Sequence, residues 1–200
     1  MRRQFAAACV FAFACADGAL APQSFAEGET PPTPTEAVTT TATVTERYIG
    51  RYLLAEIEKA RRVVWRWERL MRIRRTKATR VAEKTNDPDQ RRAILASWKR
   101  KAAARKRRAY KLARMSAWLC IYRHERHPRQ GWGTRTGNGF YGGLQMDVGF
   151  QRRYGADLLR RKGTADKWSP IEQIWVAERA YRSGRGFWPW PNTARYCGLL

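Results

Sequence analysis

The chain has 200 residues, and its hydrophobic content of 44% excludes a chain too polar to bury a core. Its 40 Lys and Arg against 17 Asp and Glu give a formal charge of +23, with a pI near 11.0. This excess predicts attraction to polyanions, and charge alone does not choose among nucleic acid, anionic lipid and anionic wall polymers.

Residues 1–26 are predicted to be an export signal. Arg2 and Arg3 give a positive start, residues 5–16 form an apolar run, and Ser24-Phe25-Ala26 places small residues where a signal peptidase reads. The run is shorter than the roughly 20 apolar residues of a transmembrane helix. An uncleaved N-terminal anchor is the alternative, and both readings predict an exported protein.

A disordered linker is predicted over residues 27–45. Proline and threonine dominate this segment, and almost no large apolar group is present to be buried. Such a composition is typical of a spacer that forms no core of its own.

Residues 46–115 are predicted to form a basic antiparallel hairpin of two helices. Asn86-Asp87-Pro88-Asp89 separates the halves, because proline cannot continue the helical hydrogen-bond ladder and Asp or Asn caps the next helix. Apolar residues at helical spacing predict one buried stripe on each helix. They are Leu53, Ile57, Ala60, Val64, Trp67 and Met71, then Leu95, Trp98, Ala102, Ala109 and Leu112.

Most of the excess charge falls on this hairpin, which has about 24 Lys and Arg against about 7 Asp and Glu. A solvated helical face without a partner is the alternative reading. The size of the excess favours a bound polyanion, and an exported protein would meet anionic cell-wall polymers or a membrane surface.

Residues 116–200 are predicted to form a mostly helical α+β domain with a small β element. A helix is expected over residues 118–125. Another begins at Ser169-Pro170-Ile171-Glu172, which combines a capping serine, a proline at the first helical position and an acidic first turn. Gly184 marks its end.

The stretch Thr136-Gly137-Asn138-Gly139-Phe140-Tyr141-Gly142-Gly143-Leu144-Gln145-Met146-Asp147 predicts a tight, solvent-facing hairpin, because glycines allow positive φ angles and close approach of the backbone. Other motifs accompany it in order: Cys120, Glu125, Trp132, residues 171–179, the Trp-Pro pairs at 188–191 and Cys197. Together they resemble the resuscitation-promoting factor type of transglycosylase-like (lysozyme-like) domain, over residues of about 116–200.

The resemblance implies cleavage of peptidoglycan glycan strands at the β-1,4 bond between N-acetylmuramic acid and N-acetylglucosamine, with Glu125 as general acid. Breaking a glycosidic bond requires a proton for the leaving oxygen, and a carboxylic acid in apolar surroundings can supply it, as in lysozyme. Glu125 would lie at the end of a helix and near aromatic residues. The alternative is that it only forms an ion pair with Arg123, Arg126 or Arg129.

A second carboxylate is usual in glycosidases, and the resemblance points to Asp147. Enzymes of this group that cleave without water need one Glu alone, so hydrolase and lytic transglycosylase both stay open. The candidate substrate-binding residues are Asp147, Gln145, Trp132, Thr136, Asn138 and Tyr141.

Cys120 and Cys197 are predicted to form a disulfide, because they are the cysteines left after signal removal and the compartment is oxidising. The family pattern has Cys directly before Glu, whereas His124 stands there and Cys120 lies about one helical turn earlier. The longer segment 191–196 would supply the matching displacement. His124 and His127 are the only histidines, so no metal site is expected, and no cofactor is expected either.

The sequence therefore predicts a secreted or cell-wall protein that cleaves peptidoglycan. One rival is a non-catalytic glycan-binding or signalling module that keeps the groove. The other is a basic nucleic-acid-binding protein, against which the export signal and the paired cysteines argue.

Overall fold

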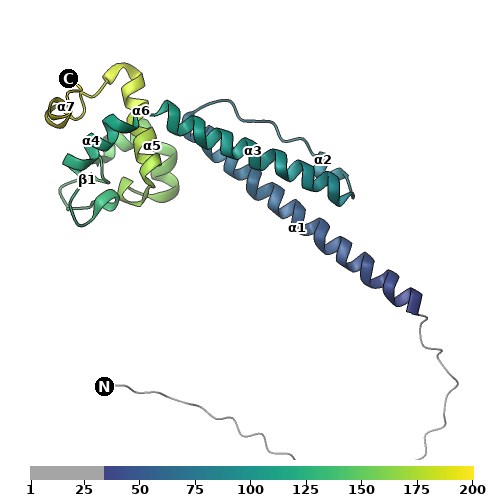
Figure 1. Ribbon diagram of the computed structural model, residues 1–200. Helices are drawn as coiled ribbons and strands as arrows, with labels where there is room; N and C mark the ends of the chain where they lie inside the picture. The colour runs from purple at the N-terminus through teal and green to yellow at the C-terminus, as the bar shows by residue number, and fades with distance from the viewer. Residues whose placement is uncertain (1–33) are drawn as a thin grey trace, which may run out of the picture. The chain divides into compact units, whose positions relative to one another are not determined.

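Figure 1 shows the computed structural model, which describes the backbone of residues 34–200 and the side chains from residue 46 onward. The expected signal peptide, 1–26, and residues 27–33 of the expected linker lie outside this part. None of the helices within residues 34–200 has the length and apolar composition needed to cross a membrane. The elements are α1 (Pro34–Met71), α2 (Val81–Lys84), α3 (Pro88–Leu112), α4 (Met115–Glu125), η1 (Gly131–Gly133), β1 (Phe140–Tyr141), β2 (Met146–Asp147), α5 (Val148–Lys162), η2 (Ala165–Lys167), α6 (Pro170–Ala180), η3 (Tyr181–Arg185) and α7 (Pro191–Tyr196).

The first helix begins earlier than the sequence predicts. Residues 34–45 are helical, so the disordered linker expected over 27–45 is wrong for this part. Proline suits the first turn of a helix, and each residue added to an existing helix contributes one further hydrogen bond. The helix therefore extends beyond the apolar stripe that marks its buried part.

The two long helices run parallel, so the predicted antiparallel hairpin is wrong. Gly50 near the start of the described side chains lies against the guanidinium of Arg91, and Glu68 accepts a hydrogen bond from Arg105 Nε at 2.9 Å. Residue numbers on α1 and α3 thus rise together, and Figure 1 shows both helices advancing toward the C-terminal domain. The segment 72–87, which connects them, runs back alongside the helices before α3 begins.

The buried carboxylate of Glu68 explains this return. Arg72 takes a left-handed φ of 52°, and the Ile73 amide donates to the Glu68 carbonyl at 3.0 Å, which ends α1 in a Schellman-type turn. Glu68 is only 1% exposed, and its carboxylate accepts from the Thr76 amide at 2.8 Å. The segment after Met71 is therefore held against the side of α1.

The expected mostly helical α+β domain is confirmed. β1 and β2 pair antiparallel, with Phe140 opposite Asp147 and Tyr141 opposite Met146. Every residue of α6 from Ile171 to Ala180 is buried, so this helix forms the centre of the core. The helix start predicted at Ser169-Pro170-Ile171-Glu172 is present, and the Glu172 carboxylate accepts from the Ser169 amide at 2.8 Å.

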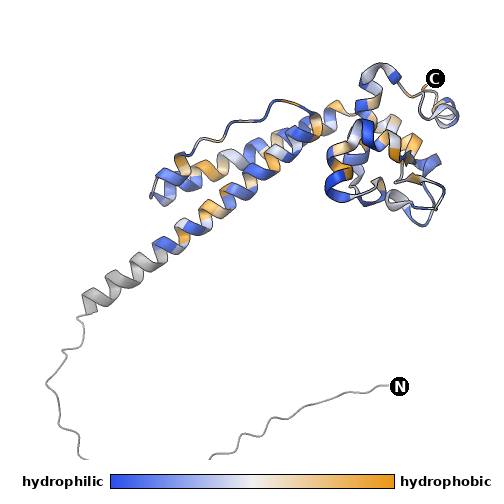
Figure 2. Cartoon of the chain, turned by 180° about the vertical axis from the view of Figure 1, so that it is seen from behind, coloured by the Kyte–Doolittle hydropathy of each residue, from blue (hydrophilic) through white to orange (hydrophobic). Residues whose placement is uncertain are grey.

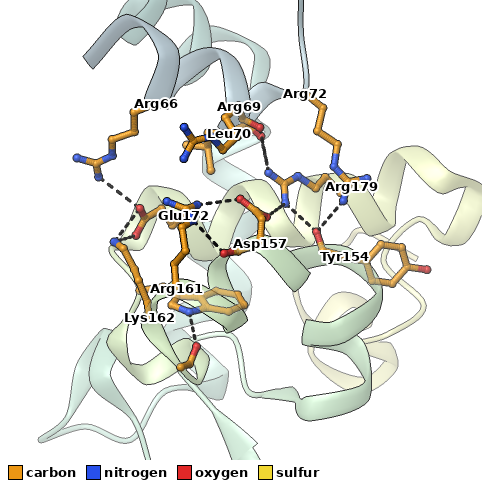
Figure 3. Close-up of polar contacts among 12 residues, drawn as sticks. Arg66, Arg69, Leu70, Arg72, Tyr154, Asp157, Arg161, Lys162, Glu172 and Arg179 are labelled. Carbon is orange, nitrogen blue, oxygen red and sulfur yellow. Dashed lines mark hydrogen bonds and ion pairs between the residues drawn. The ribbon is translucent and has the colours of Figure 1, made fainter. Parts of the chain in front are cut away.

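Arg179 of α6 holds the end of α1 on the domain (Figure 3). Its Nη2 donates to the Leu70 carbonyl at 2.8 Å, and its Nη1 donates to the Tyr154 carbonyl of α5 at 2.8 Å. A guanidinium at a helix C-terminus satisfies carbonyls that lack a helical partner and interacts favourably with the helix dipole. Trp67 and Met71 belong to the same apolar cluster as the domain core. The helical pair and the domain therefore pack as one body.

Replacing Arg179 with alanine should uncouple α1 from the domain. The Leu70 carbonyl loses the charged donor at 2.8 Å, and the Tyr154 carbonyl keeps only its bond from Arg72 Nη2 at 3.3 Å, so we expect the free energy of unfolding to fall by about 3 kcal/mol. Denaturant unfolding would measure it, with Arg160→Ala as the control because Arg160 is exposed and makes no side-chain hydrogen bond within residues 46–200. Equal midpoints for the two variants would contradict this role.

Two buried carboxylates make the stability of this body depend on pH. Burial acts to raise the pKa of Glu172, but hydrogen bonds from Lys162 and Ser169 outweigh it and hold the pKa below the usual 4.5. Burial likewise acts to raise the pKa of Glu68, and bonds from Thr76 and Arg105 lower it below the same value. A lowered pKa in the folded state means that the folded state prefers the ionised form.

We therefore expect stability from these groups to be fully present above about pH 4.5 and to be lost as the pH falls through their lower, folded-state pKa values. Thermal unfolding from pH 7 to pH 3 would show a flat region and then a decline. Glu172→Gln should lower the plateau and reduce the slope of the decline. A decline of unchanged slope in this variant would mean that other carboxylates cause it.

Candidate functional site

Glu125 is the last residue of α4 and faces α7. Its Oε1 accepts a hydrogen bond from the hydroxyl of Thr193 on α7. The predicted disulfide is confirmed and joins the same two helices, with the Cα atoms of Cys120 and Cys197 6.1 Å apart. The two contacts lie about one helical turn apart along both α4 and α7. The earlier position of the first cysteine is thus matched on the partner helix.

His124 occupies the position where the family pattern has its cysteine. Its ring packs against Tyr196 at 4.2 Å between centroids. Its nitrogen lies near both sulfur atoms of the disulfide, and these three residues are the one group of potential metal ligands found among the described residues. Because the sulfurs are bonded to each other, they are not available as thiolate ligands.

A cavity of about 260 Å³ opens beside Glu125. Its walls come from the end of α4, the glycine-rich hairpin and the segment that leads into α7. The lining residues are Glu125, Asn138, Phe140, Gln145, Pro189, Trp190, Pro191, Asn192 and Thr193. The structure therefore brings together three of the predicted site residues, Glu125, Asn138 and Gln145.

Glu125 has no cationic partner in this setting. Within residues 46–200, where side chains are described, no ion pair involves it, and its hydrogen bond is to a neutral hydroxyl. The guanidinium of Arg126 instead donates to the Pro128 carbonyl at 3.0 Å. The alternative that Glu125 only pairs with a neighbouring arginine is therefore wrong. In a chain with 40 Lys and Arg, a half-buried carboxylate left unpaired on a cavity wall is a candidate reactive group.

Gln145 lies in a strained turn of the hairpin. Its φ is 47°, a left-handed value that is unfavourable for a residue with a side chain, and its amide donates to the Gly142 carbonyl at 3.1 Å. The side-chain Nε2 donates to the same carbonyl at 2.8 Å. This turn fixes the side chain of Gln145 at the cavity wall.

Packing requires two of the hairpin glycines, and Gly142 also has the positive φ that the sequence predicts, 78°. A Cβ at Gly143 would lie 2.6 Å from the ring of Tyr122, and one at Gly142 would lie 2.5 Å from Gln173 Oε1. The hairpin is thereby pressed against α4 and α6.

The other predicted site residues lie elsewhere. Asp147 lines an adjoining cavity and caps α5, because its Oδ1 accepts from the Phe150 amide at 2.7 Å. Trp132 stacks on Tyr122 with ring centroids 4.0 Å apart. Thr136 and Tyr141, like Trp132, line neither of these two cavities.

Sequence reasoning missed Thr193 and Trp190 as parts of the site. Trp190 is 5% exposed, and its Nε1 donates to the Leu144 carbonyl at 2.7 Å, which fixes the indole under the hairpin. The tandem Trp-Pro pairs were the available signal. Nothing in the sequence pattern places the hydroxyl of Thr193 on Glu125, since that contact depends on how α7 packs.

Comparison with known proteins supports the resemblance. A family model described as a transglycosylase-like domain matches residues 112–192. The resuscitation-promoting factor RpfE of Mycobacterium tuberculosis (strain ATCC 25618 / H37Rv) is 42% identical over 64 residues, which are 32% of this chain and 34% of that protein. The chain thus matches about a third of the length of this curated relative. No solved structure matches the chain. The C-terminal part is thus similar to transglycosylase-like domains and, over 64 residues, to a resuscitation-promoting factor.

Proposed function

We propose that the domain cleaves the glycan strands of peptidoglycan at the β-1,4 bond between N-acetylmuramic acid and N-acetylglucosamine. The observation that carries this proposal is the position of Glu125: it is unpaired by any cation within residues 46–200 and stands on the wall of a cavity. The match to the transglycosylase-like family adds the substrate class. A secreted or cell-wall location follows from this substrate.

In the proposed reaction Glu125 gives its proton to the leaving glycosidic oxygen as the bond to the anomeric carbon breaks. The resulting carboxylate then takes a proton from the group that attacks the anomeric carbon. That group is water in a hydrolase and the 6-hydroxyl of the muramic acid residue in a lytic transglycosylase. The hydroxyl of Thr193 donates to Oε1, so it can orient the carboxyl group during both steps.

One carboxylate is sufficient for this scheme. Asp147 already accepts the Phe150 amide as the cap of α5, so its lining position suits substrate binding better than attack on the sugar. Asn138 and Gln145 offer amides for hydrogen bonds to sugar hydroxyls, and the indole of Trp190 supplies an apolar wall.

The basic helices α1 and α3 are proposed to hold the protein on anionic wall polymers or a membrane surface. Figure 2 shows hydrophilic residues over much of both helices. Several exposed cations on α3 make no ion pair within residues 46–200: Lys99, Arg100, Lys106 and Arg107. Unpaired exposed cations in this density create a positive potential that attracts polyanions.

Replacing Glu125 with glutamine should abolish the release of soluble fragments from purified peptidoglycan while leaving binding to the glycan intact. Glutamine keeps the size of the side chain but cannot donate an acidic proton, so a loss of at least about 100-fold is expected. Mass spectrometry of the products would measure it, with Glu83→Gln on the surface of α2 as control. Reducing ends would identify a hydrolase, and 1,6-anhydro ends would identify a lytic transglycosylase.

The same experiment separates the enzyme from a non-catalytic binding module. The family pattern has a cysteine directly before the glutamate, and this chain has His124 there. This departure is the reason to test for a binding module. If the unaltered, folded protein binds peptidoglycan but releases no more than Glu125→Gln does, the enzyme proposal is wrong and the binding module stands.

Wall binding through α3 should depend on salt. Between about 0.01 M and about 0.15 M salt the screening length falls from about 30 Å to about 8 Å, so retention on purified walls should weaken over this range. Glutamine at four exposed α3 positions should weaken retention further: Lys99, Arg100, Lys106 and Arg107. The control variant loses the same number of positive charges in the C-terminal domain, by glutamine at four exposed positions: Arg123, Arg152, Arg160 and Arg195. Equal retention of both variants in cosedimentation would show that α3 has no special role.

A further inference from the structure

A second cavity, of about 350 Å³, adjoins the one that contains Glu125. The two share four lining residues: Phe140, Gln145, Pro189 and Trp190. The groove therefore continues past the hairpin onto the first two turns of α5, where Asp147 and Arg153 line it. A long substrate held beside Glu125 would reach this part.

Two arginines make the second cavity positively charged. Arg153 comes from α5 and Arg185 from η3, and neither forms an ion pair within residues 46–200. Arg185 stands between two glycines with left-handed φ values, 92° at Gly184 and 53° at Gly186, which define a turn that few other residues could form. The one acidic lining residue, Asp147, is engaged by the amide that it caps.

The pKa of Tyr154, which lines this cavity, indicates that the surroundings favour a negative charge. It is 4% exposed, and its hydroxyl accepts from Ser183 Oγ at 3.4 Å. Burial acts to raise the pKa of Tyr154, but hydrogen bonds from Ser183 and Arg185 and the positive charges of Arg153 and Arg185 outweigh it and lower the pKa. Surroundings that favour an anionic phenol oxygen also favour other anionic oxygens.

We propose that this second cavity binds a carboxylate of the peptide attached to muramic acid, while the glycan strand lies beside Glu125. This inference rests on the proposed function. A guanidinium presents paired N–H donors that match the two oxygens of a carboxylate, and two guanidinium groups from separate elements fix its position. Where the peptide is attached, the lactyl carboxyl group of muramic acid is taken up in an amide and the sugars carry no charge, so a cavity with two arginines free of ion pairs within residues 46–200 suits the peptide carboxylate. The protein would thus prefer strands whose peptide carboxylates are free over strands in which they are amidated.

The test measures this preference directly by binding. The full chain with Glu125→Gln, which prevents cleavage, is titrated calorimetrically with a soluble tetrasaccharide muropeptide and with the same muropeptide after amidation of its carboxylates. We expect the free acid to bind about tenfold more tightly. Adding Arg153→Gln and Arg185→Gln should bring the ratio of the two dissociation constants close to one. Arg152→Gln is the matched control on α5, because Arg152 does not line the cavity, and it should keep the tenfold ratio.

Several results would overturn the inference. One is equal dissociation constants of the free and amidated muropeptides in the Glu125→Gln chain. Another is a tenfold ratio of these constants that survives the loss of both cavity arginines. The third is a fall of this ratio that is just as large when Arg152→Gln is added instead. Binding of inorganic phosphate in competition with the muropeptide, at comparable affinity, would assign the cavity to phosphate and also contradict the proposal. Release of fragments by the unaltered protein tests the proposed function separately, so a failure of either can be told from a failure of the other.

Discussion

The contact of Arg179 with the last carbonyls of α1 is the constraint on which the rest of the structure depends. A buried guanidinium needs acceptors for its donors, and Arg179 Nη2 finds one on α1 at Leu70 while its Nη1 finds one on α5 at Tyr154. The end of the basic helical pair is therefore part of the domain core, where Trp67 also lies. A polyanion bound to the helices would be held at a fixed place relative to the domain.

The same helix, α6, positions the other parts of the site through further buried polar side chains. Glu178 accepts from the Arg114 amide at 2.7 Å and from Trp118 Nε1 at 2.8 Å, which fixes the start of α4, the helix that ends at Glu125. Gln173 Nε2 donates to the Trp132 carbonyl at 2.8 Å and so holds the approach to the hairpin. The family motif on α6 is thus structural: its polar residues hold the elements that carry the chemistry.

Much of the C-terminal domain could be predicted from the sequence, because its signals are local or follow the family pattern. Ser169 and Glu172 mark a helix start within four neighbouring positions, and the pairing of Cys120 with Cys197 needed only the count and the pattern. The parallel course of α1 and α3 could not be predicted in this way. It depends on the carboxylate of Glu68, buried against Thr76 and Arg105, and a single Glu in a basic helix gives no sign of such a contact.

The site shows the same division. Glu125, Asn138 and Gln145 could be predicted because they belong to the ordered set of motifs that carries the family resemblance. In the structure all three line the same cavity. Thr193 and the arginine-lined continuation of the groove arise from packing of α7 and from the turn after α6, so they are visible only in three dimensions.

The most direct test of the account is a crystal structure of the Glu125→Gln protein with an oligomer of alternating N-acetylmuramic acid and N-acetylglucosamine. We expect the strand to lie in the groove between the hairpin and α7, with a glycosidic oxygen within about 3.2 Å of the side chain at position 125. A strand bound elsewhere, or one whose glycosidic oxygens all lie out of reach of that side chain, would contradict it.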